Sequence, residues 1–285
     1  MMLEGKIIVI TGSVRGFGFH TAQACLAAGA TVIITGRTQE SLEAARTRLA
    51  SPERVAGFLL DVRYEDQVHS LAAQIVEQFG RFDVWINNAG YSSAAGMILD
   101  MNPHEALEMF LTNDLGTMYG TQAAMHHFLS RKAGTLVNIY GNGSFLRPAT
   151  PVALYGATKA WLTSFTRSLA KENAGSGVKI LGFSPGMMTT DMLTRPRVVG
   201  EAAQAQLKNL PFVLRLLSQP PEIPARKLVQ LLASQRREFV EYQMFKPWTP
   251  LLGLLRVAWQ ALTHTGKAPA ITLQNEPAYR FEPKS

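Results

Sequence analysis

The stretch that most constrains the fold lies near the N-terminus, where a β-branched run meets a glycine-rich turn. Lys6 to Thr11 (KIIVIT) is typical of a strand that is buried on both faces. It leads into Thr11 to Gly18 (TGSVRGFG) and then into a helical stretch that ends at Gly29. A strand, a glycine turn and a helix in this order predict a βα unit whose helix N-terminus offers unpaired N–H groups to phosphates.

The three glycines of this turn have separate expected roles. Gly12 permits the tight turn, and Gly16 lets the backbone approach a pyrophosphate. Gly18 allows the helix to pack closely against the strand. The alternative is a purely structural turn. The residues expected to face a dinucleotide here are Gly12, Ser13, Arg15, Gly16, Phe17 and Gly18.

The end of the second predicted strand indicates which dinucleotide is bound. Thr31 to Thr35 is followed by Gly36 and Arg37, and no Asp or Glu stands there. A carboxylate at this point would bind the ribose 2′-hydroxyl of NAD and repel a 2′-phosphate. Arg37 and Arg15 instead predict a guanidinium pair that favours NADP(H). Two solvated surface arginines are the alternative.

Strand-like and helix-like runs then alternate along the chain. Further strands are expected at 55–62, 82–86, 135–140, 178–183 and 238–242, and helices at 39–49, 65–79, 104–129, 153–169 and 221–233. This alternation predicts an α/β fold, a single doubly wound Rossmann domain with a mostly parallel seven-stranded sheet. The domain is expected over 1–243, and an apolar C-terminal helix with an irregular tail over 244–285.

Polar side chains follow two of these strands, at the edge where open α/β sheets bind ligands. Asp61 and Val62 close the third strand, and the carboxylate is expected either to cap a loop or to bind the adenine amino group. Asn87 and Asn88 lead into Ala89-Gly90, where they can stabilise an irregular turn or line the cofactor crevice. Val62, Asn88, Ala89 and Gly90 are therefore also candidate cofactor contacts.

The candidate chemistry lies on the predicted helix that begins near Ala153. Tyr155 and Lys159 are four residues apart and so share one face of that helix. A free phenol titrates near pH ~10, but a neighbouring ammonium favours the phenolate and is expected to lower the pKa. The pair is then a candidate proton donor and acceptor. Asn113 lies within the long predicted helix, where an asparagine often points to solvent.

Taken together, these motifs resemble the short-chain dehydrogenase/reductase family in its classical-type pattern, over about residues 5 to 192. The resemblance implies NAD(P)(H) binding and hydride transfer to or from a carbonyl carbon. It implies that Tyr155 is the catalytic acid, that Lys159 binds the nicotinamide ribose and that Asn113 holds a water. Pro185 and Gly186 belong to the same pattern. Met188 and Thr190 would lie by the nicotinamide carboxamide.

One position departs from the family pattern. The family serine usually stands thirteen residues before the tyrosine, where this chain has Asn142, and Ser144 lies two residues later. Either Ser144 reaches the carbonyl through a reshaped loop or Asn142 supplies the hydrogen bond; Ser144 is favoured because a hydroxyl both donates and accepts. The displaced serine resembles the chlorophyll(ide) b reductase subgroup, in which NADPH reduces a 7-formyl group.

The C-terminal third is unusually apolar. In the family the region 192–217 forms the substrate lid, so its leucines predict an apolar substrate, with ordinary core packing as the alternative. The segment 245–262 is apolar over most of its circumference. It is expected either to contact a membrane peripherally or to pack on the lid or on a second copy.

Composition narrows the remaining classes. The net charge is +7, but no basic run suggests nucleic acid, and no spacing suggests a metal site. The single cysteine, Cys25, is expected to be a small buried hydrophobe. No targeting signal or membrane span is recognised, which predicts a cytoplasmic chain that is at most peripheral to a membrane. The resemblance implies a homodimer or homotetramer.

Three functions are therefore expected in turn. The first is an NADPH-dependent reductase of an aldehyde or ketone on a large apolar molecule, such as the 7-formyl of chlorophyll(ide) b. The second is a reductase of a sterol, 3-keto-lipid or xenobiotic carbonyl. The third is a non-catalytic NADP(H)-binding regulatory protein, which the asparagine at the serine position motivates.

Overall fold

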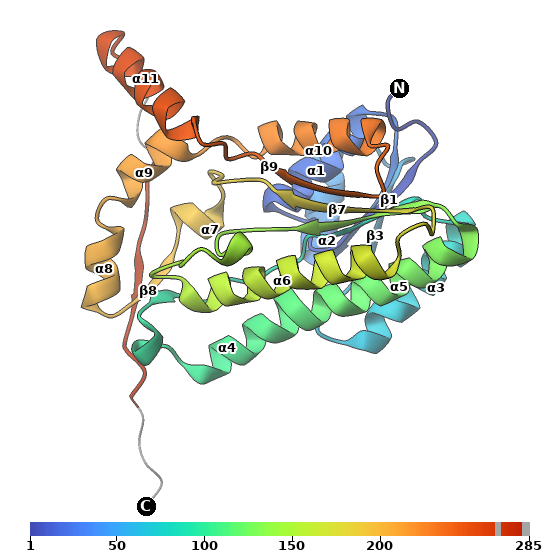
Figure 1. The fold of residues 1–285 in the computed structure, drawn as a ribbon, viewed down its shortest axis with the longest axis horizontal. Coiled ribbons are helices and arrows are strands. Elements are labelled where there is room, and N and C mark those ends of the chain that lie inside the picture. Colours follow the sequence, from blue (N-terminus) through green and yellow to red (C-terminus); the bar gives the residue numbers. More distant parts are fainter. Residues whose placement is uncertain (266–268, 281–285) are drawn as a thin grey trace, which may run out of the picture.

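The computed structural model describes residues 1–265 and 269–280. Its main element is a seven-stranded sheet in the order β3-β2-β1-β4-β6-β7-β9 (Figure 1). All neighbouring strands in it are parallel. The strands are β1 Ile7–Ile10, β2 Thr31–Gly36, β3 Val55–Leu59, β4 Val84–Asn87, β6 Gly134–Ile139, β7 Val178–Ser184 and β9 Phe239–Gln243. The predicted doubly wound fold is confirmed.

Helices cover both faces of this sheet. They are α1 Gly16–Ala27, α2 Gln39–Leu49, α3 Glu65–Phe79, α4 Pro103–Phe110, α5 Gly116–Arg131, α6 Ala153–Glu172, α7 Asp191–Thr194, α8 Glu201–Leu207, α9 Leu210–Leu217, α10 Glu222–Ser234 and α11 Thr249–Leu262. One core cluster joins α1, α2 and α10 to the sheet, and a second joins α3 and α5 to the opposite face. Cys25 is fully buried in the first cluster, as expected.

The long helix predicted over 104–129 is wrong as one element. It is divided into α4 and α5 by a π-helical turn, Leu111–Leu115. A π turn adds a residue to the helical period and occurs often at functional sites. The extra residue turns Asn113 inward, and its side chain is 1% exposed, which excludes the alternative that it points to solvent.

The tail is not wholly irregular, which corrects a second expectation. A small parallel sheet has the order β10-β8-β5, with β5 Ala95–Gly96, β8 Arg197–Val199 and β10 Gln274–Glu276. The Arg197 guanidinium bonds Glu276, Glu105 and the hydroxyl of Tyr91. The chain after α11 is thus bound to β8. The expected tail also includes 266–268 and 281–285, which lie outside the described residues.

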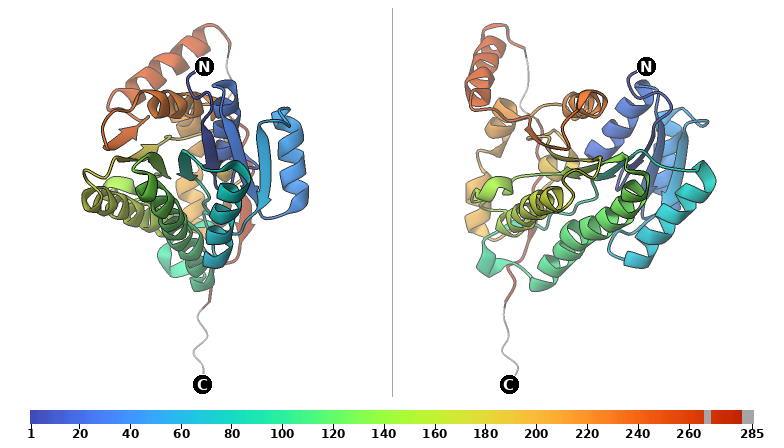
Figure 2. Two further views of the ribbon diagram at one scale, coloured as in Figure 1. Left: turned by 90° about the vertical axis from the view of Figure 1, so that its right-hand side faces the viewer. Right: turned by 45° about the vertical axis from the view of Figure 1, so that its right-hand side comes forward.

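At one end of the molecule, α8, α9 and α11 extend beyond the main sheet. Figure 1 shows α11 standing away from the body, and both views of Figure 2 agree. Among the described residues, no helix has the length and apolarity needed to cross a membrane.

Candidate active site

The glycine turn opens the N-terminus of α1 to the carboxyl edge of the sheet. Gly12 and Gly16 have φ values of +61° and +58°, which side chains rarely adopt. A Cβ at Gly12 would lie 2.9 Å from the Ala89 Cα, whereas a Cβ at Gly16 would meet nothing within 4 Å. A Cβ at Gly18 would strike the Asn88 side chain. Gly12 and Gly18 therefore serve close packing, and Gly16 leaves an open approach.

A hydrogen-bond bridge joins this turn to the end of β4. The Thr11 hydroxyl oxygen accepts from Asn88 N (3.0 Å) and Ala89 N (2.9 Å). The Asn88 amide donates in return to the carbonyls of Thr11 (2.9 Å) and Gly12 (3.0 Å). Asn88 thus stabilises the turn. Gly90, two residues later, is exposed. Thr11 is missing from the sequence-predicted site, although its place at the strand end was a usable signal.

Two side chains of the turn point into the protein. The Ser13 hydroxyl donates to Ile10 O (2.7 Å) and accepts from Thr35 N (3.0 Å). Phe17 is buried, and its ring stacks on Phe183 with centroids 6.0 Å apart. What these two positions offer a ligand is their backbone, since their side chains are used for packing.

The region beside the β2 end fits a 2′-phosphate. Arg15 and Arg37 are exposed, and neither forms an ion pair with a described residue. The carboxylate of Asp61, at the end of β3, is bound through both oxygens by Arg63, which lowers the pKa of Asp61. Asp61 Oδ1 also accepts from Arg63 N (3.1 Å), so this carboxylate caps its loop, one of the two roles expected for it. A phosphate would therefore meet guanidinium groups and a neutralised acid.

Arg63 was not identified from the sequence. Its side chain bridges Asp61 and Glu108, so it ties the β3 end to α4. The signal was the Asp-x-Arg spacing, which permits a bidentate pair. The neighbouring Val62 is buried and packs where Gly116 opens α5: a Cβ on that glycine would lie 2.8 Å from Val62 Cγ2.

The tyrosine and lysine meet at the end of β6. A Cβ at Gly141 would lie 2.6 Å from the Tyr155 hydroxyl, so this hydroxyl lies directly beside the second residue after β6. Lys159 Nζ donates to Ile139 O (3.1 Å) and lies 5.6 Å from the centroid of the Tyr155 ring. The expected side-by-side placement is present, and Gly141 is a further residue that the site requires.

The expected lowering of the phenol pKa is wrong for this geometry. Burial raises the pKa of Tyr155 to about 12, because the phenolate would lose its hydration. Burial also lowers the pKa of Lys159 to about 8, an effect that the Asp114 carboxylate opposes. In the protein alone, Tyr155 is therefore held as a protonated donor, and Lys159 titrates near neutral pH.

Asp114 is a buried acid that the sequence reading overlooked. It lies in the π turn, is 2% exposed, and its Oδ1 has no hydrogen-bond partner. Burial raises the pKa of Asp114 to about 7, while Lys159 acts in the opposite direction. A charged residue beside Asn113 in an otherwise apolar stretch was the available signal. Asp114 and Lys159 therefore influence each other's protonation.

Asn113 is fixed from three sides. Its Oδ1 accepts from Tyr91 N (2.8 Å), and its amide donates to Tyr91 O (2.9 Å) and to the Thr158 hydroxyl (3.0 Å). Thr158 lies on α6 between the tyrosine and the lysine. These bonds use the side chain of Asn113 to join α6 to the loop after β4. They place the π turn against the Tyr155 helix.

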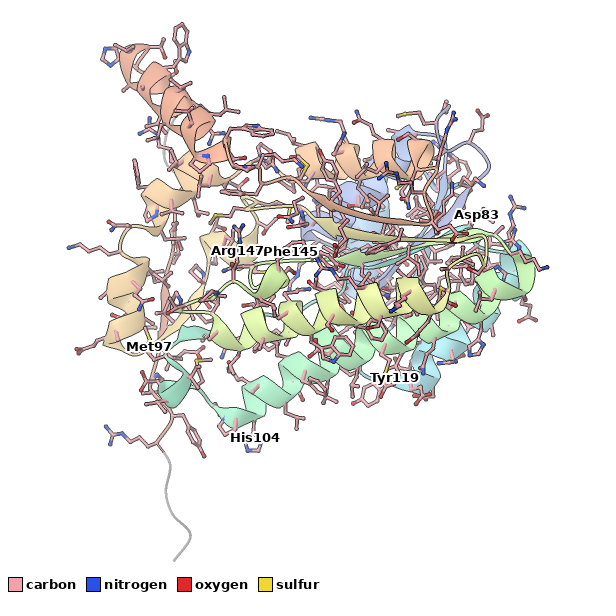
Figure 3. The ribbon with its side chains drawn as sticks, in the orientation of Figure 1. Asp83, Met97, His104, Tyr119, Phe145 and Arg147 are labelled. Atoms are coloured by element: carbon pink, nitrogen blue, oxygen red, sulfur yellow. The ribbon has the colours of Figure 1, made fainter. Side chains whose placement is uncertain are left out.

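The loop after β6 separates the two candidates for carbonyl binding. The Ser144 hydroxyl is buried; it donates to Lys159 O (3.2 Å) and accepts from Gly141 N (3.3 Å). Asn142 is exposed. Phe145, labelled with Arg147 in Figure 3, follows with φ of +66°. Ser144 thus fixes the loop to α6, and the side chain of Asn142 faces outward.

The loop also requires two glycines that the sequence reading passed over. A Cβ at Gly143 would lie 2.2 Å from the Gly156 Cα, so the loop touches the α6 backbone next to Tyr155. Gly143 in addition has φ of +96°. Both properties exclude a larger residue at this position.

The segment after β7 is held in place by Gln219. Gly186 has φ of +75°, and the Gln219 amide donates to Pro185 O (3.0 Å). Thr189 N donates to Gln219 O (3.2 Å), so the segment is bonded to the second residue after α9. Met188 and Thr190 are half-buried here, at the edge shared with Tyr155.

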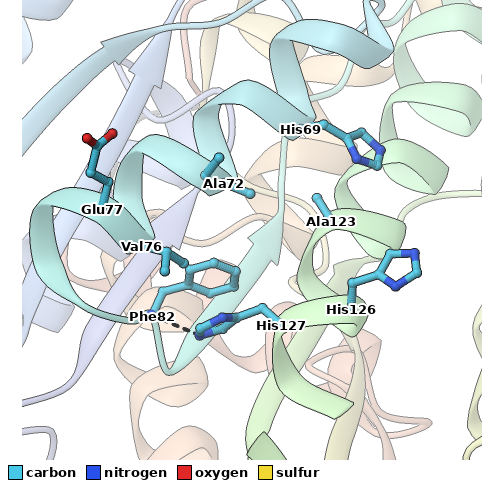
Figure 4. Close-up of a pocket in the computed structure, with 9 residues that line it drawn as sticks. His69, Ala72, Val76, Glu77, Phe82, Ala123, His126 and His127 are labelled. Atoms are coloured by element: carbon cyan, nitrogen blue, oxygen red, sulfur yellow. Dashed lines mark hydrogen bonds between the residues drawn. The ribbon is translucent and has the colours of Figure 1, made fainter. Parts of the chain in front are cut away.

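A separate surface depression lies between α3 and α5. It is lined by His69, Glu77, His126 and His127 among others, and Phe82 N donates to His127 Nε2 (Figure 4). Burial lowers the pKa of His127. No group of three or more potential metal ligands occurs in 1–265 and 269–280. The depression is on the helical face and away from the sheet edge that carries Tyr155.

A parallel sheet with a glycine turn after β1 and a tyrosine–lysine pair beside the β6 end defines a dinucleotide-dependent oxidoreductase. The model of the short chain dehydrogenase family matches residues 6–197. The chain belongs to this family.

Individual proteins agree with this assignment. Chlorophyll(ide) b reductase NOL of Arabidopsis thaliana is 35% identical over 229 residues, which cover 78% of this chain and 64% of that protein. A short-chain dehydrogenase from Streptomyces avermitilis superposes with a TM-score of 0.73 at 27% identity, over 93% of this chain and 97% of the other. ElxO with NADP bound has a TM-score of 0.70 at 27% identity, over 84% and 97%.

Proposed function

We propose that this protein is an NADPH-dependent reductase of an aldehyde or ketone carried by a large apolar molecule. The observation that carries the proposal is the Tyr155 hydroxyl beside Gly141, at the same sheet edge as the glycine turn. A protonated phenol at that edge is suited to giving a proton to a carbonyl oxygen.

The chain's own groups then have distinct tasks. Bound NADPH supplies a hydride to the carbonyl carbon. Tyr155 donates its proton to the carbonyl oxygen, and Lys159 holds the ribose and favours the phenolate that results. Asn113 aligns α6 with the crevice. Asn142 donates a hydrogen bond to the carbonyl from the exposed side of its loop, while Ser144 keeps that loop in place.

The NADP(H) preference rests on Arg15 and Arg37 together with the neutralised Asp61. Replacing Arg37 with Asp removes one guanidinium and adds a carboxylate that repels a 2′-phosphate. The ratio of kcat/KM for NADPH to that for NADH should fall by about tenfold or more, as expected for the loss of a charge-assisted bond. Arg236→Asp, at an exposed arginine before the amino end of β9, is the matched control. An unchanged ratio in Arg37→Asp would refute the phosphate role.

The substrate class follows from apolar side chains around the crevice. Leu146, in the loop after β6, and Met192, in α7 after β7, are both exposed. Exposed apolar side chains at a binding site favour an apolar ligand. The similarity to chlorophyll(ide) b reductase supports a formyl-bearing pigment. We also infer a homo-oligomer and a cytoplasmic location, with membrane contact limited to the periphery.

A substrate panel tests this proposal. It contains a chlorophyllide b-type aldehyde, a 3-keto-steroid, a 3-keto-acyl thioester and a small soluble aldehyde, each assayed by NADPH oxidation. The highest kcat/KM for the pigment aldehyde supports the first function, and a keto-lipid preference supports the second. Tight NADPH binding without turnover of any carbonyl would overturn both and support a non-catalytic binding protein.

A further inference from the structure

Helix α11 has its apolar side turned away from the protein. Six of its large side chains are between 51% and 79% exposed: Leu251, Leu252, Leu254, Leu255, Trp259 and Leu262. At 3.6 residues per turn these positions, with Ala258, form one continuous outward arc that contains no polar residue. A surface helix of a soluble domain normally shows the reverse pattern, with polar residues outward.

The inner side of α11 is fixed to α9. Gly253 is buried where the two helices meet, and a Cβ there would strike the carbonyl of Leu216. The Arg256 guanidinium donates to the carbonyls of Arg215, Leu216 and Ser218, and Arg215 Nε donates to the Gln260 side chain (3.2 Å). The polar side chains of the helix are thus used in holding it, and the orientation of its apolar arc is determined by these contacts.

The stretches around α9 and α11 contain basic residues and no acidic ones. The sequence contains no Asp or Glu from 202 to 221 or from 242 to 275, the two stretches that hold α9 and α11. The same stretches contain Lys208, Arg215, Lys246 and Arg256. A second copy seated on α11 by two-fold symmetry would bring these cations together. An anionic surface would instead complement them.

The dimensions fit a helix that lies in a membrane surface. Its 14 residues correspond to about 21 Å at 1.5 Å per residue, which is shorter than the ~30 Å hydrocarbon core. Trp248, at the start of the helix, is 59% exposed, and Trp259 is 66% exposed near its end. Tryptophan prefers the level of the lipid headgroups.

We propose that α11, supported by α9, docks this protein on an anionic lipid bilayer, with its apolar arc below the headgroups and the net positive charge of the region close to them. The exposed Phe212 lies on α9, which together with α11 forms an appendage to the main fold, and it extends the apolar surface. The proposal is independent of which carbonyl the enzyme reduces. It accounts for an apolar outward face that neither the fold nor the crevice requires.

The test is vesicle flotation of the full chain with bilayers of phosphatidylcholine alone or with 30% phosphatidylglycerol. We expect binding to the anionic vesicles, a blue shift of tryptophan emission, and weaker binding at high salt. The double variant Leu252→Gln/Leu255→Gln should bind at least tenfold more weakly, because two apolar side chains leave the bilayer. Leu59→Gln, at an equally exposed leucine on β3, should bind like the unmodified chain.

Folding and reduction of a soluble aldehyde serve as controls for both variants, since neither changes a site residue. Absence of binding to anionic vesicles by the unmodified chain would overturn the proposal. So would equal binding by the double variant. If that variant instead converts a dimer to a monomer in sedimentation velocity, without any vesicle binding, the arc is a contact between copies and the membrane role is wrong.

Discussion

The carboxyl edge of the main sheet and the α9–α11 appendage follow opposite rules of burial. At the sheet edge, polar side chains such as Asn113 and Ser144 are buried and have hydrogen-bond partners. On α11, leucines such as Leu255 are exposed, while the Arg256 guanidinium is used within the protein. The first arrangement holds a few groups in fixed geometry for chemistry. The second presents apolar area to something outside the chain.

The difference separates two kinds of functional site. Buried polar groups are costly unless paired, so the sheet edge is specific and sensitive to small changes. Exposed apolar area acts through its total extent, so single changes on α11 have graded effects. Variants in one region should therefore leave the property of the other region unchanged.

The largest expected effect is that of Tyr155→Phe. Loss of the proton donor should lower kcat by about 10² to 10⁴-fold, while NADPH affinity and vesicle binding stay unchanged. NADPH oxidation, cofactor fluorescence and flotation measure the three properties. Tyr119→Phe, on α5, is the control. Retained turnover in Tyr155→Phe would remove the catalytic role of the phenol.

The next effect distinguishes Asn142 from Ser144. Asn142→Ala should lower kcat by about 10²-fold through loss of a donor to the carbonyl, with little change in thermal stability. Ser144→Ala should lower the unfolding free energy by about 1 to 3 kcal/mol, because the Gly141 N–H loses its acceptor and the buried hydroxyl that joins the loop to α6 is removed. Steady-state rates and denaturant unfolding measure these effects. The reverse outcome, a stable but inactive Ser144→Ala, would assign carbonyl binding to the serine.

A third change tests the coupling of Asp114 and Lys159. Asp114→Asn removes the carboxylate that raises the pKa of Lys159, so Lys159 should lose its proton at lower pH. Because ribose binding and the phenolate both favour the charged lysine, the alkaline limb of kcat/KM should move to lower pH. Asp100→Asn is the control. A pH profile that does not move would show that Asp114 has no influence on the site.

The free energy of unfolding should also depend on pH through Asp114, and the direction of this dependence follows from its raised pKa. The folded pKa of Asp114 is about 7, above the ordinary value near ~4, so the folded state binds the additional proton. This stabilisation is fully present below pH ~4 and is lost as pH rises through about 7. Asp114→Asn should abolish that part of the pH dependence in unfolding experiments. An identical slope in the variant would contradict the raised pKa.

The smallest effect on catalysis is expected at Gly253. A Cβ there meets the Leu216 carbonyl, so Gly253→Ala should displace α11 from α9 at a cost of about 1 to 3 kcal/mol. Hydrogen exchange should increase in α11 only, and reduction of a soluble aldehyde should be unchanged. Ala258→Gly, on the outward arc, controls for helix propensity. Loss of catalysis in Gly253→Ala would show that the two regions are not separate.

The sequence predicts the regular elements well because their periodicity is local. The helices 39–49 and 65–79 agree with α2 and α3 to the residue, and the strands of the main sheet agree closely. The spacing of the apolar residues is sufficient for this, and Gly80 in addition marks the end of α3. The role of Gly18 in packing was likewise readable, since the steric need comes from the turn itself.

The features that the sequence did not predict depend on contacts between residues that are distant in the chain. The π turn reverses the orientation of Asn113, and its neighbours Tyr91 and Thr158 are far apart in sequence. The direction of the Ser144 hydroxyl depends on the α6 backbone. β10 pairs with β8 across more than seventy residues, so a short polar strand looked like an irregular tail. The local pattern of apolar and polar residues contains no information on these long-range contacts.

The return of β10 to the small sheet gives α11 two mechanical tethers. On one side the chain enters from β9 in the main sheet, and on the other side β10 is held by the Arg197 guanidinium. Arg197 also grips Tyr91, whose backbone bonds Asn113. The appendage is consequently anchored in the chain on both sides, by the main sheet through β9 and by the small sheet through β10.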